Sequence, residues 1–281
     1  MRARRIGGAV LAAAAVAAAG ACGVAGAGED SVASKDELVI GVNPDQPGVG
    51  ARDGRGGYEG FDIDVAREVA KRLGVPRGNV EFKEVSSATR EKMLDGGDVD
   101  MVVASYSITP ERKRSVTFAG PYYVAHQDIL VRASDAASVG NVRDLKGRAL
   151  CKVPGSVSFP RVHDERGVAA DPVEAKGYEG CLDLLSSGSL DAVSTDDLIL
   201  AGLAARSAER GGKPLRFVNA PFSDEPYGIG VRRGDVDGCE AVNKAITGMY
   251  QDGTAVKLLR ASFGRTDLKI TTTVPQFEGC D

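Results

Sequence analysis

The sequence predicts an α/β protein whose sheets are largely parallel. Short apolar, β-branched runs alternate with amphipathic helical stretches, beginning with 37–42 and 60–73. The same alternation returns later in the chain, where 149–153 precedes 178–186. Strands that alternate with helices favour parallel pairing, because each helix serves as the crossover between two strands. The 281 residues suit two compact lobes or one large domain.

The first half of the chain supplies the first of these units. Apolar residues recur at helical spacing in 60–73, and Gly74 ends the predicted helix. The preceding stretch, 43–57, is rich in Gly, Pro and Asp and is predicted to be a loop. Further strands are predicted at 80–85 and 100–104, and a helix at 86–95 with Ser86 or Ser87 as its N-cap.

Two strand-like runs, 127–132 and 227–232, predict that the chain crosses twice between lobes. Each follows a stretch that contains proline and aromatic residues. Such a chain leaves one lobe, builds a second and returns. Between the crossings we expect strands at 149–153 and 190–194 and helices at 178–186 and 196–205, and after them a helical segment at 236–263. The predicted lobes are therefore 36–125 with 226–281, and 126–225.

The N-terminus predicts export from the cytoplasm. Three arginines among the first five residues precede an apolar run over 6–19, and small residues then lead to Cys22. This layout is typical of a secretory signal peptide, here 1–21. The cysteine directly after it resembles a bacterial lipobox, which implies a lipidated Cys22 and a flexible tether over 22–35 at the outer face of the cell membrane. An ordinary secretory signal with a chance cysteine is the alternative.

Composition argues against two kinds of partner. The net charge is −4, and no block of Lys and Arg appears outside the extreme N-terminus, so nucleic acid is disfavoured. His126 and His163 are the two histidines, and they lie far apart in the sequence. No cluster of His, Cys and carboxylate residues has the spacing of a zinc site, so we expect no metal.

The cysteines are consistent with export. Setting Cys22 aside for lipid leaves four of the five, namely Cys151, Cys181, Cys239 and Cys280. Thiols outside the cytoplasm tend to pair, and four of them allow three connectivities. The local pairing of Cys151 with Cys181 and of Cys239 with Cys280 is favoured, because each bond then stays within one segment of the predicted organisation.

Five segments carry a resemblance that spans most of the chain. Among them are GYEGFDIDVAREVAKRLG at 57–74 and LDAVSTDDLILAG at 190–202. In order and spacing they resemble the family-3 polar amino-acid binding proteins, most closely the glutamate-binding lipoproteins of high-GC Gram-positive bacteria. The resemblance implies a type-2 periplasmic-binding-protein fold, in which two α/β lobes joined by two crossover strands hold the ligand in a cleft. The other segments are 80–94, 95–123 and 221–231.

The resemblance also implies which residues hold the charged groups of an amino acid. Arg112, in ITPER, matches the arginine that grips the α-carboxylate, a role that suits a planar, permanently charged fork. Asp196 matches the residue that receives the α-ammonium. As structural alternatives, Arg112 is a solvated helix-start residue and Asp196 a helix N-cap, although Asp197 is the better candidate for the cap. Further hydrogen bonds are implied from Ser107, the backbone at Ser105, Thr195 and Ser156.

Side-chain selectivity rests on Ser87 and Arg90 in VSSATR. In the family's glutamate and aspartate binders, a serine and a later arginine at these positions meet the distal carboxylate. Arg112, Arg90 and Asp196 then provide two positive charges and one negative, which complements zwitterionic glutamate in sign. We therefore expect a monomer that captures glutamate or a related amino acid for the permease of an ABC importer, without a cofactor. Asn43 and Gln46 are further candidate contacts.

Three other functions stay open at this point. The ligand can instead be glutamine or asparagine, or the protein can be a sensor subunit that reports amino-acid levels without transport. A lyase or dehydratase on the same fold is the third alternative, but it needs a positioned acid or base, and neither histidine falls in a ligand motif. Asp62, at the start of the predicted helix 60–73, is explained by structural capping.

Overall fold

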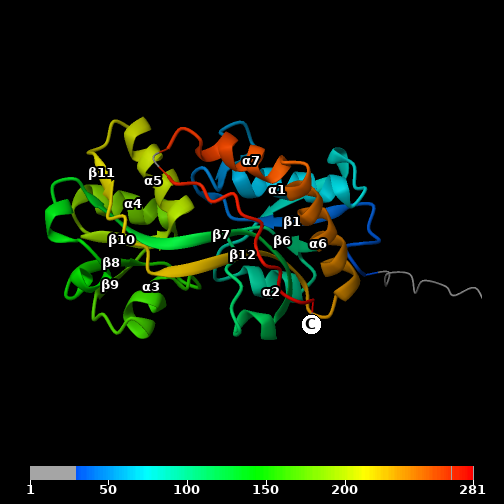
Figure 1. The fold of residues 1–281 in the computed structure, drawn as a ribbon, viewed down its shortest axis with the longest axis horizontal. Coiled ribbons are helices and arrows are strands. Elements are labelled where there is room, and N and C mark those ends of the chain that lie inside the picture. The colour runs from blue at the N-terminus through cyan, green and yellow to red at the C-terminus, as the bar shows by residue number, and fades with distance from the viewer. Residues whose placement is uncertain (1–29, 267, 281) are drawn as a thin grey trace, which may run out of the picture.

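The computed structural model describes residues 30–266 and 268–280. The predicted signal peptide over 1–21 and the predicted lipidation site, Cys22, lie outside these residues. The described chain forms two lobes, and two long strands run through both of them (Figure 1). These strands are β7 (Val116–Arg132) and β12 (Ser223–Arg232), which pair antiparallel. The predicted fold, with two lobes and two crossover strands, is confirmed.

The other strands of the main sheet are β1 (Leu38–Val42), β5 (Val80–Glu84), β6 (Met101–Val102), β8 (Ala149–Lys152), β9 (Asp171–Glu174), β10 (Ala192–Asp196) and β11 (Leu215–Phe217). The sheet has the order β5–β1–β6–β12–β7–β10–β8–β9, and β11 also pairs with β7. The crossover strands therefore lie at its centre. On one side β1 pairs in parallel with β5 and β6, and on the other β8 pairs in parallel with β9 and β10.

Helices cover the sheet in each lobe (Figure 1). Those of the first lobe are α1 (Phe61–Arg72), α2 (Arg90–Asp95), α6 (Val236–Gln251) and α7 (Thr254–Phe263), with the 3₁₀ turns η1 (Arg77–Asn79) and η2 (Arg112–Arg114). Those of the second lobe are α3 (Ser158–Pro160), α4 (Tyr178–Ser187) and α5 (Asp197–Glu209), with the short turns η3 (Ala136–Ser138), η4 (Val142–Leu145) and η5 (Arg161–Glu165). The alternation of strands and helices matches the sequence prediction. The prediction of a largely parallel sheet is wrong, because β7 pairs antiparallel with β10, β11 and β12, and β12 pairs antiparallel with β6.

Three local predictions differ from the structure. The predicted loop over 43–57 contributes to a small antiparallel sheet of β2 (Asp45–Gln46), β3 (Gly50–Arg52) and β4 (Tyr58–Glu59). Helix α2 begins at Arg90 and not at residue 86, because 86–89 forms a turn in which Thr89 Oγ1 accepts from the Ser86 N–H at 3.0 Å. The predicted helix over 236–263 is two helices, because Gly253 has a φ of 79° and interrupts the helical path.

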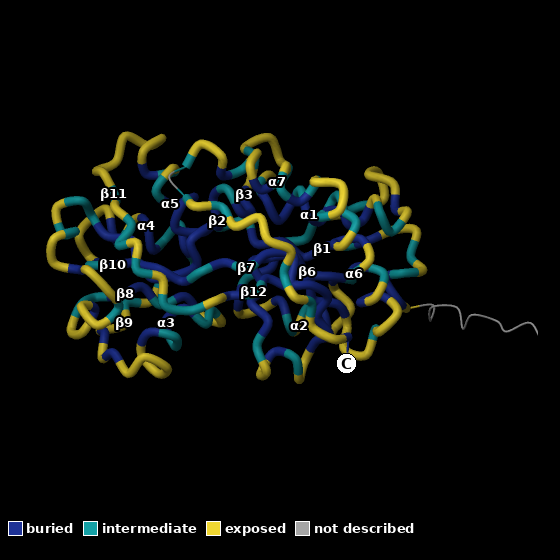
Figure 2. Tube along the Cα trace, viewed as in Figure 1, coloured by how far each residue is buried: buried dark blue, intermediate teal, exposed yellow. Residues whose placement is uncertain are grey.

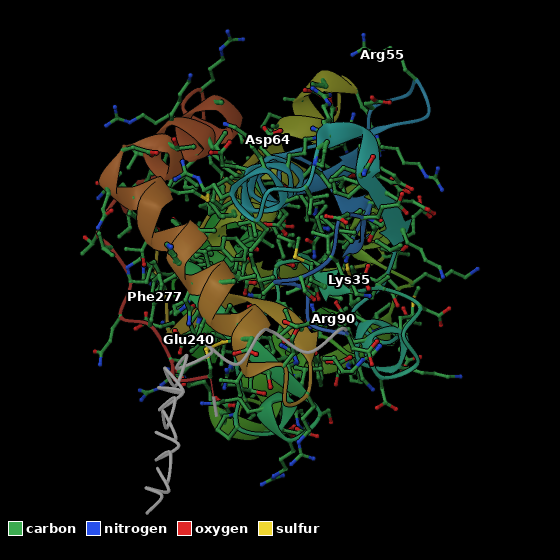
Figure 3. The ribbon with its side chains drawn as sticks, turned by 90° about the vertical axis from the view of Figure 1, so that its right-hand side faces the viewer. Lys35, Arg55, Asp64, Arg90, Glu240 and Phe277 are labelled. Atoms are coloured by element: carbon green, nitrogen blue, oxygen red, sulfur yellow. A yellow bond between two sulfur atoms is a disulfide. The ribbon has the colours of Figure 1, made fainter. Side chains whose placement is uncertain are left out.

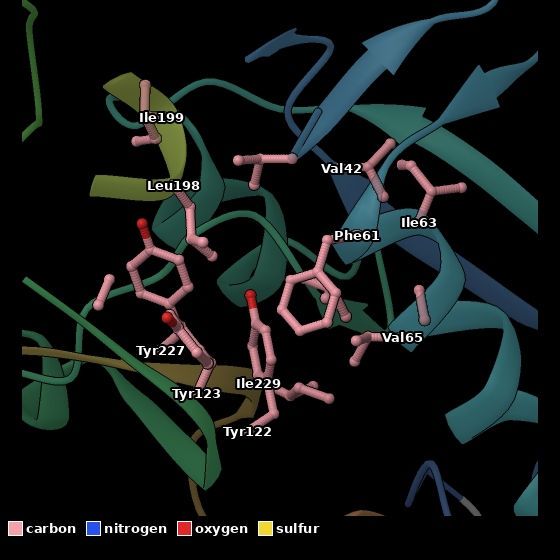
Figure 4. Packing of buried hydrophobic residues seen from close by; sticks show 14 of the residues in the cluster. Val42, Phe61, Ile63, Val65, Tyr122, Tyr123, Leu198, Ile199, Tyr227 and Ile229 are labelled. Carbon is pink, nitrogen blue, oxygen red and sulfur yellow. The ribbon is translucent and has the colours of Figure 1, made fainter. Parts of the chain in front are cut away.

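The largest apolar cluster extends through both lobes. Buried residues form a continuous band along the central strands (Figure 2). Figure 4 shows Phe61 of the first lobe near Tyr122, with Tyr123, Tyr227 and Leu198 of α5 beyond them. The rings of Phe61 and Tyr122 are 5.9 Å apart, and so are those of Tyr122 and Tyr227. Aromatic side chains of β7 and β12 therefore pack at the hinge, the region where these two crossover strands join the lobes.

The lobes touch across the cleft. Arg112 Nη2 donates to the carbonyl oxygen of Gly155 in the second lobe at 2.9 Å. The carbonyl of Pro47 lies so close to Gly202 of α5 that a Cβ at residue 202 would collide with it. Glycine is needed there because only a residue without a side chain allows this approach. The structure is therefore a closed arrangement of the two lobes.

Both favoured disulfides are confirmed. Cys151 of β8 is bonded to Cys181 of α4, and Cys239 of α6 is bonded to Cys280. The second bond fixes the C-terminal tail beside α6, as Figure 3 shows for the part of the tail that carries Phe277. The tail is held by the backbone as well, because the Glu278 N–H donates to the carbonyl of Gly120 at 2.9 Å.

The predicted tether over 22–35 is wrong at its C-terminal end. Val32 is 2% exposed and belongs to the main apolar cluster. Its backbone N–H donates to Asp235 Oδ2 at 3.0 Å, and Lys35 forms an ion pair with Asp100. The ordered domain thus begins by Ser31, which is also buried. Among the residues that the structure describes, none of the helices is long and apolar enough to cross a membrane.

Replacing Cys239 and Cys280 together by serine is expected to lower the free energy of unfolding. In the chain-entropy model a loop of 41 residues corresponds to about 4 kcal/mol. Urea denaturation of the oxidised wild type and the double variant measures the difference, and the far-ultraviolet circular dichroism of the folded forms should coincide. Equal unfolding free energies would contradict a stabilising role for this bond.

Candidate functional site

One pocket lies between the lobes, and most of the predicted ligand residues line it. In this closed arrangement the pocket is narrow, with a cavity volume of about 10 Å³. Its wall includes the predicted residues Ser87, Arg90, Ser105, Ser107, Arg112, Ser156 and Asp196. The remaining wall is formed by Gln46, Val157, Ser158, Tyr178 and Ile199.

Arg90 and Arg112 are buried together on the first-lobe wall, with side chains only 2% and 8% exposed. Arg90 begins α2, and its Cζ lies 3.8 Å from the centre of the Tyr106 ring. Arg112 begins η2 and lies 5.2 Å from the same ring centre. The face of an aromatic ring stabilises a cation, so Tyr106 supports both guanidinium groups.

Backbone carbonyls and one carboxylate complete the surroundings of the two arginines. Arg90 Nη1 donates to the Ala104 carbonyl at 2.9 Å, and Arg112 Nη1 donates to the Ser107 carbonyl at 2.8 Å. Glu91 Oε1 lies 3.7 Å from the Nε atom of each arginine. Burial lowers the pKa of Arg90 to about 10, and repulsion from Arg112 adds to this shift. The guanidinium of Arg90 therefore remains charged at neutral pH.

Asp196 provides a buried carboxylate on the opposite wall. Its Oδ2 accepts a hydrogen bond of 2.6 Å from the hydroxyl of Tyr227, which lies on the crossover strand β12. Burial raises the pKa of Asp196, and the nearby negative charge of Glu225 raises it further. The Tyr227 hydrogen bond and Arg112 act in the opposite direction. A cation placed beside Asp196 would therefore be bound strongly, because it would relieve an unfavourable buried charge.

Two buried polar atoms of pocket residues lack a hydrogen-bond partner. They are Nε of Arg90 and Oδ1 of Asp196. Buried polar groups in folded proteins are nearly always hydrogen-bonded, because a missing partner is costly. One atom is a donor on a cation and the other an acceptor on a carboxylate, and the two residues belong to opposite lobes. This arrangement fits a ligand with both an acidic and a basic group.

Ser105 is held in an unusual backbone conformation by a buried carboxylate. Its φ is 42°, which is uncommon for a residue with a side chain. The Ser105 N–H donates to Asp62 Oδ2 at 2.6 Å, and the Tyr122 hydroxyl donates to Asp62 Oδ1 at 2.7 Å. Asp62 therefore fixes the pocket residue Ser105 and the crossover-strand residue Tyr122. The predicted capping role is wrong, since the N-cap of α1 is Gly60.

The contacts of Ser105 limit its predicted role. Its backbone N–H, implied above as a donor to the ligand, is committed to Asp62. Its hydroxyl donates to Gln46 Oε1 at 2.8 Å, so Gln46 contributes to the wall as one of the two further candidates. The other, Asn43, accepts instead from the N–H of Asp45 at 3.1 Å.

A hydroxyl cluster on the second lobe was not predicted from the sequence. The hydroxyl of Tyr178 lies 2.8 Å from Ser156 Oγ, 3.0 Å from Ser158 Oγ and 2.8 Å from Thr195 Oγ1. Thr195, a predicted ligand contact, does not line the pocket; it is fully buried, and its hydroxyl donates to that of Tyr178. Ser158 has a weak sequence signal, because it lies two residues after the predicted Ser156. Nothing in the sequence pattern marks Tyr178.

The start of α5 also differs from its prediction. Asp196 occupies the N-cap position, but its side chain makes no capping hydrogen bond. Asp197 is the first residue of the helix, and its side chain accepts from the adjacent N–H of Leu198 at 2.8 Å and from the backbone N–H of His126 on β7. Neither carboxylate caps the helix, so the carboxylate of Asp196 is available to the pocket.

Comparison with known proteins agrees with this geometry. Residues 38–265 match the model of the bacterial extracellular solute-binding proteins, family 3. The chain belongs to that family. It is 36% identical over 264 residues to the glutamate-binding protein GluB of Corynebacterium efficiens, covering 91% of this chain and 89% of that protein. It is 37% identical over 246 residues to the ABC transporter glutamine-binding protein GlnH of Bacillus subtilis, covering 83% and 87%.

A solved structure of a family relative shares the fold. An ancestral arginine-binding protein bound to arginine superposes with a TM-score of 0.74 and 34% identity, covering 82% of this chain and 99% of that chain. Membership of a solute-binding family is therefore supported by sequence and by structure. Within the described residues, no group of three or more His, Cys, Asp or Glu side chains is arranged to hold a metal ion.

The pKa of Asp62 predicts a pH dependence of stability. Burial raises this pKa from 3.8 to about 7, while the hydrogen bonds from Tyr122 and Ser105 oppose the shift. The folded protein therefore binds the Asp62 proton more tightly than the unfolded chain does. The protonated carboxyl group stabilises the fold fully below the unfolded pKa of 3.8, and this stabilisation is lost as pH rises through the folded pKa of about 7. The unfolding temperature of the wild type should therefore fall over this range, and that of Asp62→Asn should fall less. Parallel pH profiles in calorimetry would contradict this assignment.

Proposed function

We propose that the protein captures an acidic amino acid, glutamate by preference, and delivers it to an ABC importer. The observation that carries this proposal is the charge pattern of the pocket. Two buried arginines face a buried carboxylate across the cleft, and Arg90 and Asp196 each keep one polar atom without a partner. Because water is largely excluded, a ligand of complementary charge gains most from entering.

Each charged group of the ligand has a counterpart on the wall. Arg112 binds the α-carboxylate, since its guanidinium is fixed by the Ser107 carbonyl and lies where the two lobes meet. The free Oδ1 of Asp196 accepts from the α-ammonium. Ser107 and Ser156 add hydrogen bonds from the two sides. The ligand thereby bridges the lobes and favours the closed state by contacts that the open state lacks.

Arg90 and Ser87 meet the distal carboxylate and set the preference for glutamate. Glutamine would leave Arg90 facing a neutral amide and lose a charge-assisted hydrogen bond, which corresponds to about 1.5–3 kcal/mol. One observation favours glutamine as a second candidate ligand. Glu91 already lies 3.7 Å from Arg90 Nε and balances part of its charge. Binding measurements decide between the two ligands.

We further propose the setting in which this binding occurs. The chain is exported and anchored by lipid at Cys22 to the outer face of the cell membrane, which keeps a monomer close to its permease. The lobes are 31–125 with 226–281, and 126–225. The protein acts by binding and not by catalysis, because the charged side chains of the pocket are all used to match the ligand.

Calorimetric titration of the chain without its first 22 residues tests the proposal. We expect tight binding of glutamate and weaker binding of aspartate, glutamine and asparagine. Tight glutamine binding with weak glutamate binding would leave an amino-acid binder but refute the preference. No binding of any of the four would refute the function.

Substitution of the arginines tests the assignment of each carboxylate. Arg90→Ala should weaken glutamate binding roughly 10- to 150-fold and change glutamine binding less, because it removes the partner of the distal carboxylate. Arg112→Ala should abolish the binding of both amino acids. Arg114→Ala is the matched control, since this exposed arginine of η2 lies outside the pocket. Unchanged glutamate affinity in Arg90→Ala would overturn the side-chain assignment.

A further inference from the structure

Helix α4 of the second lobe has no cap of its own. Its N-cap residue is Gly177, which makes no side-chain capping hydrogen bond. The first N–H groups of a helix have no partners within the helix and need acceptors from elsewhere. The acceptor here is Asp45 of β2 in the first lobe, whose carboxylate accepts from the Tyr178 N–H and from the Glu179 N–H at 3.2 Å. The helix is thus capped by the opposite lobe.

The residues around Asp45 leave space for this contact and orient the carboxylate. Gly177 leaves the space that the carboxylate occupies, because a Cβ at residue 177 would collide with it. Asn43 Oδ1 accepts from the backbone N–H of Asp45 at 3.1 Å and fixes the strand that presents the carboxylate. Two residues further, Pro47 makes the close approach to Gly202 of α5 described above.

The end of α4 offsets part of the cost of burying the Asp45 carboxylate. Burial raises the pKa of Asp45, the hydrogen bonds from the backbone N–H groups of Glu179 and Tyr178 oppose this shift, and the charges of Glu179 and Asp183 add to it. However, Glu179 is paired with Arg206 at 3.4 Å and with Arg210, and Asp183 is 3.3 Å from Arg210. The positive end of the helix dipole therefore attracts Asp45 without strong competition from the neighbouring acids.

We propose that Asp45 is a latch between the lobes, which raises the affinity for the solute without touching it. Asp45 does not line the pocket, whereas its neighbour Gln46 and its partner Tyr178 both do. When the lobes close, the carboxylate caps α4 and fixes the residue that carries the hydroxyl of the second-lobe cluster. When they open, the N–H groups of α4 return to water. Asp45 is thus a positioning residue, and its effect on affinity rests on the proposed function.

The expected size of the effect follows from the strength of helix caps. Loss of an N-cap side chain typically changes an equilibrium constant roughly 2- to 30-fold. Asp45→Ala should therefore weaken glutamate binding by a factor in this range. The change should appear as faster dissociation, because the latch holds the lobes together only while they are closed. Asp45→Asn retains one acceptor oxygen and should restore part of the loss.

A matched control exists in the same small-sheet region. Asp53 also accepts from two backbone N–H groups, those of Arg55 and Gly57, each at 2.8 Å. These contacts stay within one loop of the first lobe, so Asp53→Ala should leave affinity and dissociation rate unchanged. The measurements are calorimetric titration with glutamate and stopped-flow dissociation. Equal affinity and dissociation rate in the wild type and Asp45→Ala would overturn the latch while leaving the proposed function intact.

A second variant separates the latch from folding. Gly177→Ser gives α4 a capping residue of its own and displaces Asp45, because the new side chain occupies its space. The unfolding temperature of the solute-free protein should not fall, yet glutamate should dissociate faster. A variant with wild-type dissociation would count against the latch even if Asp45→Ala failed to fold.

Hydrogen exchange tests the latch even if glutamate does not bind. The amides of Tyr178 and Glu179 should exchange faster in Asp45→Ala than in the solute-free wild type, whereas Asp53→Ala should match the wild type. Peptides that cover the start of α4 report this by mass spectrometry. If the wild type binds none of the amino acids, the proposed function fails and exchange alone judges the latch. Identical exchange in all three proteins would then overturn it.

Discussion

The closed pocket depends on the burial of two guanidinium groups side by side. Arg90 and Arg112 cannot lose their charge at neutral pH, so the protein has to stabilise both without bulk water. The Tyr106 ring, the Ala104 and Ser107 carbonyls and the Glu91 carboxylate surround them. This shell satisfies the cations only in part, since Arg90 Nε keeps no hydrogen-bond partner. The positive charge that is not compensated favours an anion in the cleft, and a dicarboxylic amino acid supplies two carboxylates.

The crossover strands connect this electrostatic site to the hinge. The hydroxyl of Tyr122 on β7 donates to Asp62, which orders the first-lobe loop at Ser105. The hydroxyl of Tyr227 on β12 donates to Asp196 on the second-lobe wall. The same tyrosine rings pack in the apolar cluster that extends through both lobes. A change in the charge of Asp62 or Asp196 would therefore alter a hydrogen bond to a crossover strand. The position of these strands depends on how far the lobes are closed.

Elements with a strong local pattern were predictable, and their ends were less so. The helix predicted at 60–73 agrees with α1 to within one residue at each end. The agreement is close because the apolar spacing is regular and Gly74 follows. The predicted helix at 86–95 lost its first turn, because Thr89 accepts from the Ser86 N–H and forms a competing local turn. The predicted tether ended too late, because the packing of Val32 against the first lobe depends on distant residues.

The sequence by itself determined the α/β alternation and the two crossings, and it favoured the disulfide pairing that the structure contains. The family resemblance marked most of the residues that line the cleft. These features are local, because side-chain periodicity and motif spacing are properties of short segments. Only the tertiary structure decided what those residues touch. Asp45 and Tyr178 are 133 residues apart, and no periodicity links a carboxylate in one lobe to a helix end in the other. Their contact exists because the closed lobes bring the two surfaces together, and closure is a property of the whole chain.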